Sequence, residues 1–229
     1  MASAGLNKTF SGAGTNNKKG TISLWMKRSG LSSSQQVGLT TAGASGGNAG
    51  LQFGTDDRLD MYLAYDGSWR GIFETTRVFR DTSAWYHIVV AWDTTQATDT
   101  NRLKFYVNGV QETSFVSISY PPQDQVTTFG NAAAHFINYW GSGAYFDGLM
   151  THIHYTDGYT YAATDFGETD STSGIWKPKT APSVTYGTNG FFLKFENSGA
   201  MGTDSSGNSN TFATTGTLTQ NVDTPSNNF

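Results

Sequence analysis

The sequence predicts an all-β domain in which antiparallel sheets form a sandwich or jelly roll. Aromatic residues make up 14% of the 229 residues, and 27 residues are Gly. Such a composition suits pleated strands joined by tight turns. Charged residues make up only 14%, below the roughly 25% of an average globular domain. We therefore expect Ser, Thr, Asn and Gly to form most of the surface around one large core.

Three segments in the first half of the chain are predicted to be strands from their pattern of apolar and polar residues. Residues 21–27 alternate apolar and polar side chains, and residues 61–65 repeat this pattern more weakly. An alternation of this kind indicates a half-buried strand. Residues 85–93 are apolar on both faces, which is typical of a central strand that is covered on both sides.

A hairpin follows these strands. Residues 103–107 and 110–116 alternate around the dipeptide Asn108-Gly109. Asn-Gly between two such segments indicates a type I′ turn, because both turn residues need a positive φ. The inward face of the first strand should carry Leu103, Phe105 and Val107.

The second half of the chain predicts two more strands, at residues 145–155 and 190–196. Between them, residues 157–188 are polar and interrupted by Pro, which indicates a long crossing loop with a short helical turn near residues 162–166. No linker divides the chain. We expect one domain over residues 1–213, and an extended arm over residues 214–229 that packs on this domain or on a neighbouring subunit.

Charge and hydropathy exclude several classes of protein. The net charge of −4 gives no basic surface for nucleic acid. Insertion into a membrane is not expected, because no apolar segment approaches the roughly 20 residues of a membrane helix. The N-terminal residues lack the apolar region of a secretion signal, so we expect assembly in a cytoplasm. The absence of Cys excludes disulfides, thiolate nucleophiles and Cys-type zinc sites.

Four motifs occur in the order typical of laminin-G-like domains. They are GTISLWMKR at residues 20–28, AWYHIVVAWD at 84–93, LKFYVNGV at 103–110 and YFDG at 145–148. The chain therefore resembles the concanavalin A-like lectin/glucanase group. This resemblance implies a jelly-roll sandwich of two antiparallel sheets, and a calcium site of the kind that these domains often contain.

Further motifs in the C-terminal half resemble a laminin-G-like family that is common in proteins of marine bacteriophages. They include DFGETD at residues 165–170, WKPK at 176–179, TDSSGN at 203–208 and DTPSNNF at 223–229. In that family the resemblance implies virion or fibre proteins. This chain has His152 where the family usually carries an acidic residue. Residues 192–210 resemble the segment that opens ordinary laminin-G-like domains, so we expect a permuted sandwich whose C-terminal strand lies beside the N-terminal one.

The sequence favours binding over catalysis. Glucanases of this fold work with two carboxylates on one strand, where residues two positions apart share a face. The chain has only four Glu, at positions 74, 112, 168 and 196, and we expect none of them to belong to such a pair. We therefore predict that the protein is not an enzyme.

Two groups of residues are candidate metal ligands. His152 and His154 have the spacing of a metal site, but we interpret both as lining the polar face of a sheet, because no third ligand is identifiable. Asp56, Asp57 and Asp60 form a candidate site for one Ca²⁺, since calcium favours carboxylate and carbonyl oxygens. Asp204, in contrast, is expected to cap its own turn.

Aromatic residues outside the alternating core positions are candidates for stacking on a sugar or on another subunit. Trp140 is the best placed of them. The candidates, with their polar neighbours, are Trp69, Asp66, Tyr120, Asn138, Tyr139 and Trp140. The aromatic residues that we assign to the core instead are Trp25, Trp85, Trp92, Phe105, Phe146 and Phe195.

Together with these observations, the resemblance implies a bacteriophage virion protein displayed on the particle surface, as a capsid decoration, head fibre or tail fibre. It would act through protein–protein assembly with other virion proteins and as a homo-oligomer such as a trimer. Adhesion to a host-surface glycan is compatible with this role. The alternatives are a dedicated carbohydrate-binding module for receptor recognition and, third, a polysaccharide-degrading enzyme.

Overall fold

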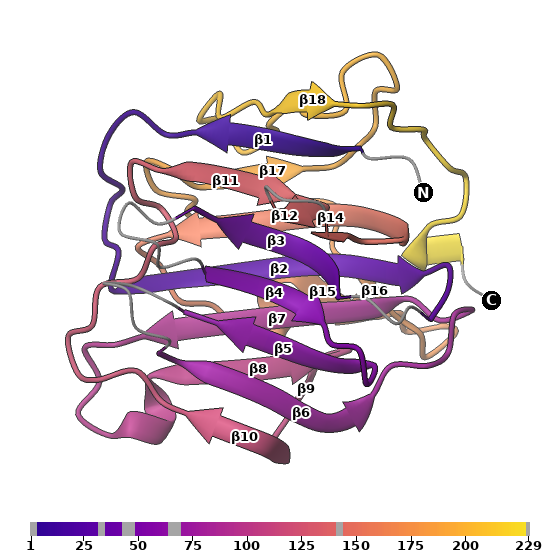
Figure 1. Cartoon of the computed structure of the whole chain (residues 1–229). Helices are drawn as coiled ribbons and strands as arrows, with labels where there is room; N and C mark the ends of the chain where they lie inside the picture. The colour runs from indigo at the N-terminus through magenta and orange to yellow at the C-terminus, as the bar shows by residue number, and fades with distance from the viewer. Residues whose placement is uncertain (1–3, 32–34, 43–48, 64–69, 141–143, 228–229) are drawn as a thin grey trace.

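The computed structural model describes residues 4–31, 35–42, 49–63, 70–140 and 144–227. Within these residues, two antiparallel sheets pack face to face (Figure 1). The larger sheet has eight strands in the order β10 (Phe115–Ser119), β6 (Ile72–Val78), β5 (Arg58–Tyr62), β4 (Ala49–Phe53), β3 (Gln36–Thr41), β11 (Ala134–Ile137), β1 (Gly5–Thr9) and β18 (Ala213–Thr215). The smaller sheet has six, in the order β17 (Phe191–Leu193), β14 (Gly148–Asp157), β2 (Lys19–Arg28), β7 (Tyr86–Asp93), β8 (Leu103–Val107) and β9 (Val110–Gln111). The predicted all-β jelly-roll sandwich is confirmed.

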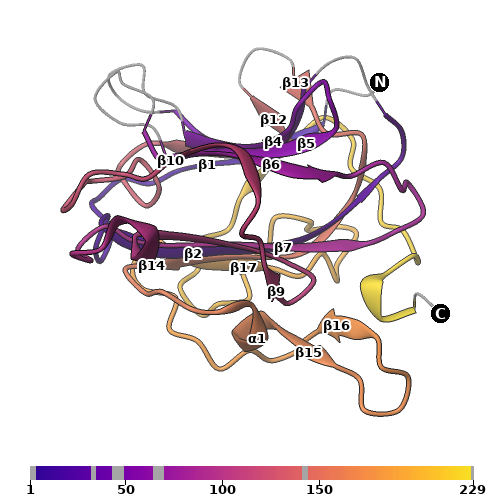
Figure 2. The ribbon, with the colours of Figure 1, turned by 90° about the horizontal axis from the view of Figure 1, so that it is seen from below.

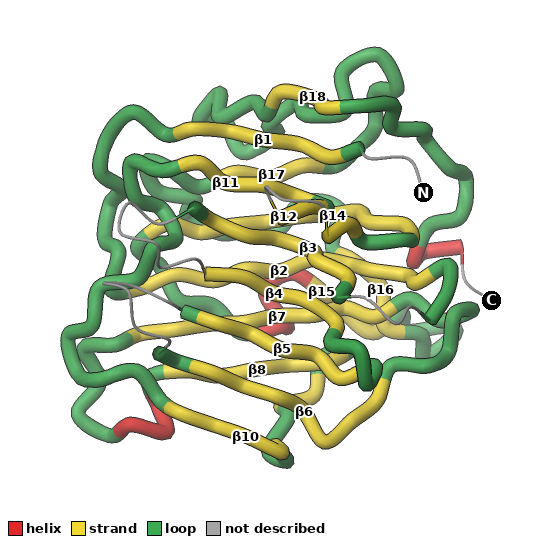
Figure 3. Tube along the Cα trace, in the orientation of Figure 1, coloured by secondary structure: helices red, strands yellow, loops and turns green. Residues whose placement is uncertain are grey.

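Helical turns are few in the described part of the chain (Figure 3): α1 (Ala163–Phe166), η1 (Asp99–Asn101) and η2 (Pro225–Asn227). None of these described helices is long or apolar enough to cross a membrane.

Strand β7 lies near the centre of the smaller sheet, between β2 and β8. All its residues after Tyr86 are buried. Ile88, Val90 and Trp92 belong to the core between the sheets, and the alternate residues point to the opposite face, which is also covered. The prediction of a central strand with two covered faces is therefore confirmed.

The hairpin predicted from Asn108-Gly109 joins β8 to β9. Asn108 has φ 48° and Gly109 has φ 82°, so both turn residues are left-handed, as a type I′ turn requires. The three residues assigned to the inward face, Leu103, Phe105 and Val107, are 2–3% exposed. The turn and the inward face are therefore confirmed. The second strand is shorter than predicted, because β9 ends at Gln111 and residues 115 and 116 belong to β10 of the larger sheet.

The aromatic residues assigned to the core are buried, with one exception. Trp25, Trp85, Trp92, Phe105 and Phe146 are at most 6% exposed. Phe195 is only partly buried and packs against the edge of the core. Trp25 does not face the larger sheet, but stacks on His87 with ring centroids 4.6 Å apart.

The segment from residue 158 to residue 190 covers the outer face of the smaller sheet (Figure 2). It contains α1, close to the helical turn that the sequence predicts, and a hairpin of β15 (Gly167–Thr169) and β16 (Trp176–Pro178). Its side chains bond to histidines of the sheet: Trp176 Nε1 donates to His87 Nδ1 at 3.0 Å, and the Tyr186 hydroxyl lies 2.8 Å from His154 Nδ1. Both histidines are therefore hydrogen-bonded sheet residues under a cover.

The strand predicted at residues 145–155 is interrupted. Tyr145 ends β13 (Ala144–Tyr145), which pairs with β12 (Tyr139–Trp140) over the larger sheet, whereas β14 begins at Gly148 in the smaller sheet. Phe146 turns into the core between them and stands 6.1 Å from Phe53, centroid to centroid. The chain changes sheets here, and a continuous strand cannot do so without a bend.

The first and the last described strands lie together at one side of the sandwich. Strand β18 pairs antiparallel with β1, with Thr214 opposite Leu6, and β17 pairs with β14. The C-terminal strand thus lies beside the N-terminal one, as the resemblance to a permuted sandwich implies. After β18 the chain continues along the side of the sandwich to η2 (Figure 1).

Candidate functional site

A pocket of about 290 Å³ opens where the two sheets separate, near the chain ends. Strands β1 and β11 of the larger sheet line one side, and residues 148–152 of β14 line another. Residues 194–196, just after β17, and residues 218–221, 223 and 224 form much of the rest of the wall, to which Trp85 and Met201 also contribute. The pocket is therefore built by both sheets and by the C-terminal segment together.

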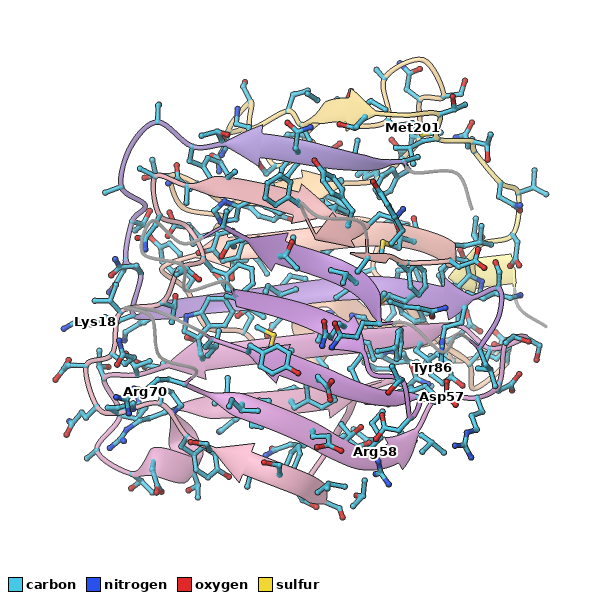
Figure 4. All side chains as sticks on the ribbon, viewed as in Figure 1. Lys18, Asp57, Arg58, Arg70, Tyr86 and Met201 are labelled. Atoms are coloured by element: carbon cyan, nitrogen blue, oxygen red, sulfur yellow. The ribbon has the colours of Figure 1, made fainter. Side chains whose placement is uncertain are left out.

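The inner part of the pocket is apolar. Leu6 and Ile137 reach it from the larger sheet, and Met150 reaches it from the smaller one. Leu218 closes the apolar wall from the C-terminal segment, and both Met150 and Leu218 also pack against the core. Met201, near the end of β18 in Figure 4, completes the lining. Apolar walls with few polar groups are typical of small-molecule sites.

Charged and polar groups gather at one side of the pocket. Lys194 Nζ lies 3.7 Å from Glu196 Oε1, and these side chains are 28% and 73% exposed. His152 stands beside them, with Nδ1 3.0 Å from the Thr151 hydroxyl. Burial, and then the charge of Lys194, lower the pKa of His152 to about 4, although Glu196 acts in the opposite direction. The imidazole is therefore neutral at pH 7.

Three non-glycine residues of the pocket wall have left-handed backbones. They are Asn138 with φ 73°, His152 with φ 47° and Phe195 with φ 62°. Among the residues that the structure describes, seven non-glycine residues have positive φ, so nearly half of them line this one pocket. Such conformations cost roughly 1–3 kcal/mol each and tend to cluster where a ligand binds.

The strain at His152 coincides with an irregularity of β14. The register between β14 and β2 shifts between Thr151 and His154, which is the mark of a β-bulge. The expected alternation of His152 and His154 is broken by this shift. His154 lies fully buried under the cover, against Tyr186 and Phe192, whereas His152 lines the pocket.

The C-terminal segment is fixed to the pocket wall by side-chain hydrogen bonds. Asp223 accepts from Trp85 Nε1 at 2.9 Å and from Lys27 Nζ at 2.7 Å. The hydrogen bond from Lys27, which has the larger effect, and the one from Trp85 hold the pKa of Asp223 below its usual range. Gln220 Nε2 donates to the carbonyl oxygens of Phe195 at 2.9 Å and Glu196 at 3.2 Å.

A family model matches residues 5–164 and is described as the concanavalin A-like lectin/glucanases superfamily. The match spans more than half of the chain. The chain belongs to this superfamily. No curated protein matches it in sequence.

Several solved structures resemble the chain at low sequence identity and with TM-scores below 0.5. A SAP-like pentraxin from Limulus polyphemus is 11% identical, with a TM-score of 0.47 over 71% of this chain and 73% of that one. The CBM40 of a Ruminococcus gnavus IT-sialidase, solved with α2,3-sialyllactose, is 12% identical, with a TM-score of 0.47 over 72% of this chain and 92% of that one. Tailspike protein 2 of bacteriophage CBA120 is 11% identical, with a TM-score of 0.44 over 70% of this chain and 25% of that one.

Of the residues predicted to contact a glycan or another subunit, Asn138 lines the pocket. Its Nδ2 donates to the Ala4 carbonyl at 2.7 Å. Tyr139 instead packs on Phe136 and Tyr145, with centroids 4.9 and 5.8 Å away, and is not in the pocket lining. Tyr120 is half-buried against the core.

The other members of that predicted group, Asp66, Trp69 and the side chain of Trp140, lie outside the described residues. The pocket residues that the sequence did not predict come from segments far apart in the chain, among them residues 5–6, 148–152, 194–196 and 218–221. Only the departure from the family pattern at His152 pointed to one of them.

The calcium candidates do not act as one group. Asp57 accepts from the buried Arg28 and from Arg80, each at 2.9 Å. Burial raises the pKa of Asp57, but the hydrogen bonds and charges of these arginines outweigh it and hold the pKa low. A Cβ placed on Gly54 would lie 2.8 Å from Asp56 Oδ1 and 3.2 Å from Asp60 Oδ2, so only these two carboxylates approach one another.

Asp56 also pairs with Arg58 at 2.9 Å. Across the described residues, no group of three or more His, Asp or Glu is placed to hold a metal ion. The calcium site stays a prediction.

Two pairs of acidic residues were not predicted from the sequence. Asp60 lies opposite Glu74 across β5 and β6 on the outer face of the larger sheet. Burial raises the pKa of Asp60 to about 6, with a further contribution from Glu74. Glu168 and Asp170 do stand two positions apart, but Asp170 binds Lys177 at 2.8 Å and the turn amides of residues 172 and 173. The expectation that no Glu has such a neighbour was therefore wrong, although Asp170 is held in a turn.

Proposed function

We propose that the chain is a non-enzymatic carbohydrate-binding protein displayed on a bacteriophage particle, and that the pocket at the chain ends binds a neutral sugar. The single observation that carries the proposal is this pocket, whose lining includes three non-glycine residues with left-handed backbones, in a member of the lectin/glucanase superfamily. The superfamily supports carbohydrate binding in general, and the pocket is where we propose that the sugar binds.

The chemistry of the pocket suits a sugar ring. Phe195 and Met150 offer apolar surface to the C–H groups of a ring, while Lys194 and Glu196 offer a donor and an acceptor to adjacent hydroxyls. The charges of Lys194 and Glu196 offset one another, and His152 is neutral. Asp223, which also lines the pocket, is paired with Lys27, so the charged groups around the pocket are balanced. Such a pocket favours a neutral sugar over an anionic one.

The arrangement of the acidic residues in the pocket supports the proposal that the protein is not an enzyme. Glu196 and Asp223 are the acidic residues among those that line it. Asp223 is bonded to Lys27 and Trp85, so it is committed to holding the C-terminal segment. Glycosidases need two carboxyl groups free to act on the same bond, about 5–10 Å apart, and this lining does not supply them.

The role on a virion is supported by the phage-like motifs of the C-terminal half and by a surface with few charges. Strand β10, at the edge of the larger sheet, contains no charged residue and exposes Val116 (53%) and Ile118 (38%). Unprotected edge strands of this kind pair with other chains, which supports assembly through protein–protein contacts. Mass spectrometry of purified particles of the encoding phage tests this role, and absence of the protein would contradict it.

The alternative is a dedicated receptor-recognition module with no part in particle structure. Deletion of the coding region separates the two roles. If particles still assemble but no longer adsorb to host cells, the dedicated module is favoured.

Sugar binding is tested with a glycan array that contains neutral and acidic glycans, with and without Ca²⁺. The test variant is Glu196→Ala. Its matched control is Glu168→Ala, because Glu168 is likewise exposed and lies 3.9 Å from Lys177. We expect neutral glycans to bind, and Glu196→Ala to bind about ten-fold more weakly, since a charged hydrogen bond contributes about 1.5–3 kcal/mol. An equal loss of glycan affinity in both variants, or the absence of any bound glycan, would contradict the proposal.

A further inference from the structure

The residues from 216 to 224, which we call the strap, follow β18 along the side of the sandwich (Figure 1). Residues 218–221, 223 and 224 of the strap line the pocket. In the described chain no strand lies within the strap, so no ladder of backbone hydrogen bonds fixes it. Leu218 is half-buried against the core, whereas Val222 is 90% exposed. The strap therefore holds to the domain through a few separate contacts.

The strongest of these contacts is at Asp223. Its carboxylate joins the strap to Lys27 at the end of β2 and to Trp85 just before β7, at 2.7 and 2.9 Å. The Lys27 side chain is 19% exposed and that of Asp223 is 36% exposed, so this ion pair is partly shielded from water. Asp223 is thus a latch near the far end of the strap.

The near end of the strap has the features of a hinge. Gly216 has φ 70° and directly follows β18, which is fixed by its pairing with β1. Glycine tolerates both left-handed and right-handed backbones, so rotation at Gly216 can swing the strap while β18 stays in the sheet.

The groups that hold the strap also line the pocket. Trp85 binds Asp223, and the carbonyl oxygens of Phe195 and Glu196 bind Gln220, while all three residues face the pocket. A ligand in the pocket therefore touches the same residues as the strap. Opening of the strap and binding of a ligand must then influence one another.

We propose that the strap opens at Gly216 to admit the ligand and closes over it, and that Asp223 is the positioning residue that sets how often it opens. The proposal rests on the proposed function of the pocket for the identity of the ligand. The latch itself is a property of the unliganded protein and can be measured without a sugar.

Hydrogen–deuterium exchange of the full chain tests the latch. Asp223→Asn keeps an oxygen for Trp85 but removes the charge that pairs with Lys27. The matched control is Asp170→Asn, because Asp170 forms a similar pair with Lys177 at 2.8 Å outside the pocket lining. We expect exchange of the strap amides to become about ten-fold faster in Asp223→Asn, as the opening equilibrium shifts by one charged hydrogen bond. Unchanged strap exchange in Asp223→Asn would overturn the proposal.

Stopped-flow binding of the best neutral sugar from the array tests the coupling. We expect the association rate of Asp223→Asn to exceed that of the wild type, because the open form is more populated. An association rate equal to that of the wild type, with faster strap exchange, would overturn the idea that opening admits the ligand. Absence of sugar binding by the wild type would overturn the proposed function instead, and the exchange measurement would still decide the latch.

Discussion

Trp176 donates its indole Nε1 proton to Nδ1 of His87, 3.0 Å away and 89 positions earlier in the chain. The other ring nitrogen of His87 lies 2.8 Å from the Ser23 hydroxyl. This arrangement needs a neutral imidazole, because a protonated ring has no lone pair to accept from the indole. The bond fastens the cover, residues 158–190, to the middle of the smaller sheet.

The first prediction concerns pH. Burial lowers the pKa of His87 to about 3 and holds that of His154 well below 6.5. The unfolded chain takes up these protons near pH 6.5, while the folded chain does not. Stability should therefore fall as the pH drops from about 6.5 toward 3, by up to about 1.4 kcal/mol per pH unit for each histidine.

Urea unfolding at pH 7 and pH 4.5 measures this effect. His87→Gln keeps an acceptor for Trp176 but cannot be protonated, so its stability should depend less on pH than that of the wild type. Trp176→Phe is the control: it should be less stable at both values yet keep the pH dependence. An identical pH dependence in His87→Gln would refute the assignment.

The second prediction concerns Arg28, which is buried in the side of the sandwich near Asp57, the residue labelled in Figure 4. Arg28 binds Asp57 and the Phe79 carbonyl, and its guanidinium lies 4.8 Å from the Phe53 ring. Arg28→Ala should lower the free energy of unfolding by about 3–5 kcal/mol, because it leaves a buried carboxylate without one of its partners. Chemical denaturation provides the measurement.

Lys18→Ala is the matched comparison, since Lys18 pairs with Asp124 at 3.0 Å on the surface. An exposed pair contributes about 0–1 kcal/mol. Equal losses in Arg28→Ala and Lys18→Ala would show that burial does not govern the strength of these ion pairs.

The third prediction concerns the strained His152. His152→Gly removes the energetic penalty that a side chain imposes on a left-handed backbone, so the melting temperature should stay the same or rise. Neutral-sugar affinity should fall, because an imidazole of the pocket wall is lost. Calorimetry and the glycan array measure the two effects. A large loss of stability with unchanged affinity would mean that His152 serves the fold and not the pocket.

The fourth prediction concerns assembly. Ile118→Lys places a charge on the exposed edge strand β10 and should weaken self-association. Thr214→Lys, on the polar edge strand β18, is the comparison variant. Sedimentation velocity over a range of concentrations measures both. A monomeric wild type, or equal behaviour of the two variants, would rule out β10 as the assembly edge.

Local patterns predicted most strands of the smaller sheet but missed most of the larger one, including β1, β3, β4, β6 and β11. The hairpin at Asn108 and the central strand at residues 85–93 follow from turn chemistry and hydrophobicity within a few residues of sequence. The hairpin at residues 167–178 was missed, because strands of three residues carry no visible period. The interruption before Gly148 was also missed, because Phe146 is drawn inward by residues of a distant strand.

The candidate site was far less predictable. Its wall combines Asn138, residues 148–152, residues 194–196 and the strap, which only the folded sandwich brings together. Asn138 was found through its aromatic neighbours, although Tyr139 itself packs elsewhere. Similarly, Asp60 and Glu74 face one another across two strands, and a search along single strands could not detect that pairing.

The central claim is that the pocket binds a neutral sugar. NMR titration of the ¹⁵N-labelled full chain with methyl glycosides of glucose, galactose, mannose and N-acetylglucosamine tests it most directly. We predict that at least one glycoside shifts the amide signals of residues 148–152, 194–196 and the strap. Shifts centred instead on Gln52, Asp60 and Tyr62 of the larger sheet, or no shifts with any glycoside, would contradict the claim.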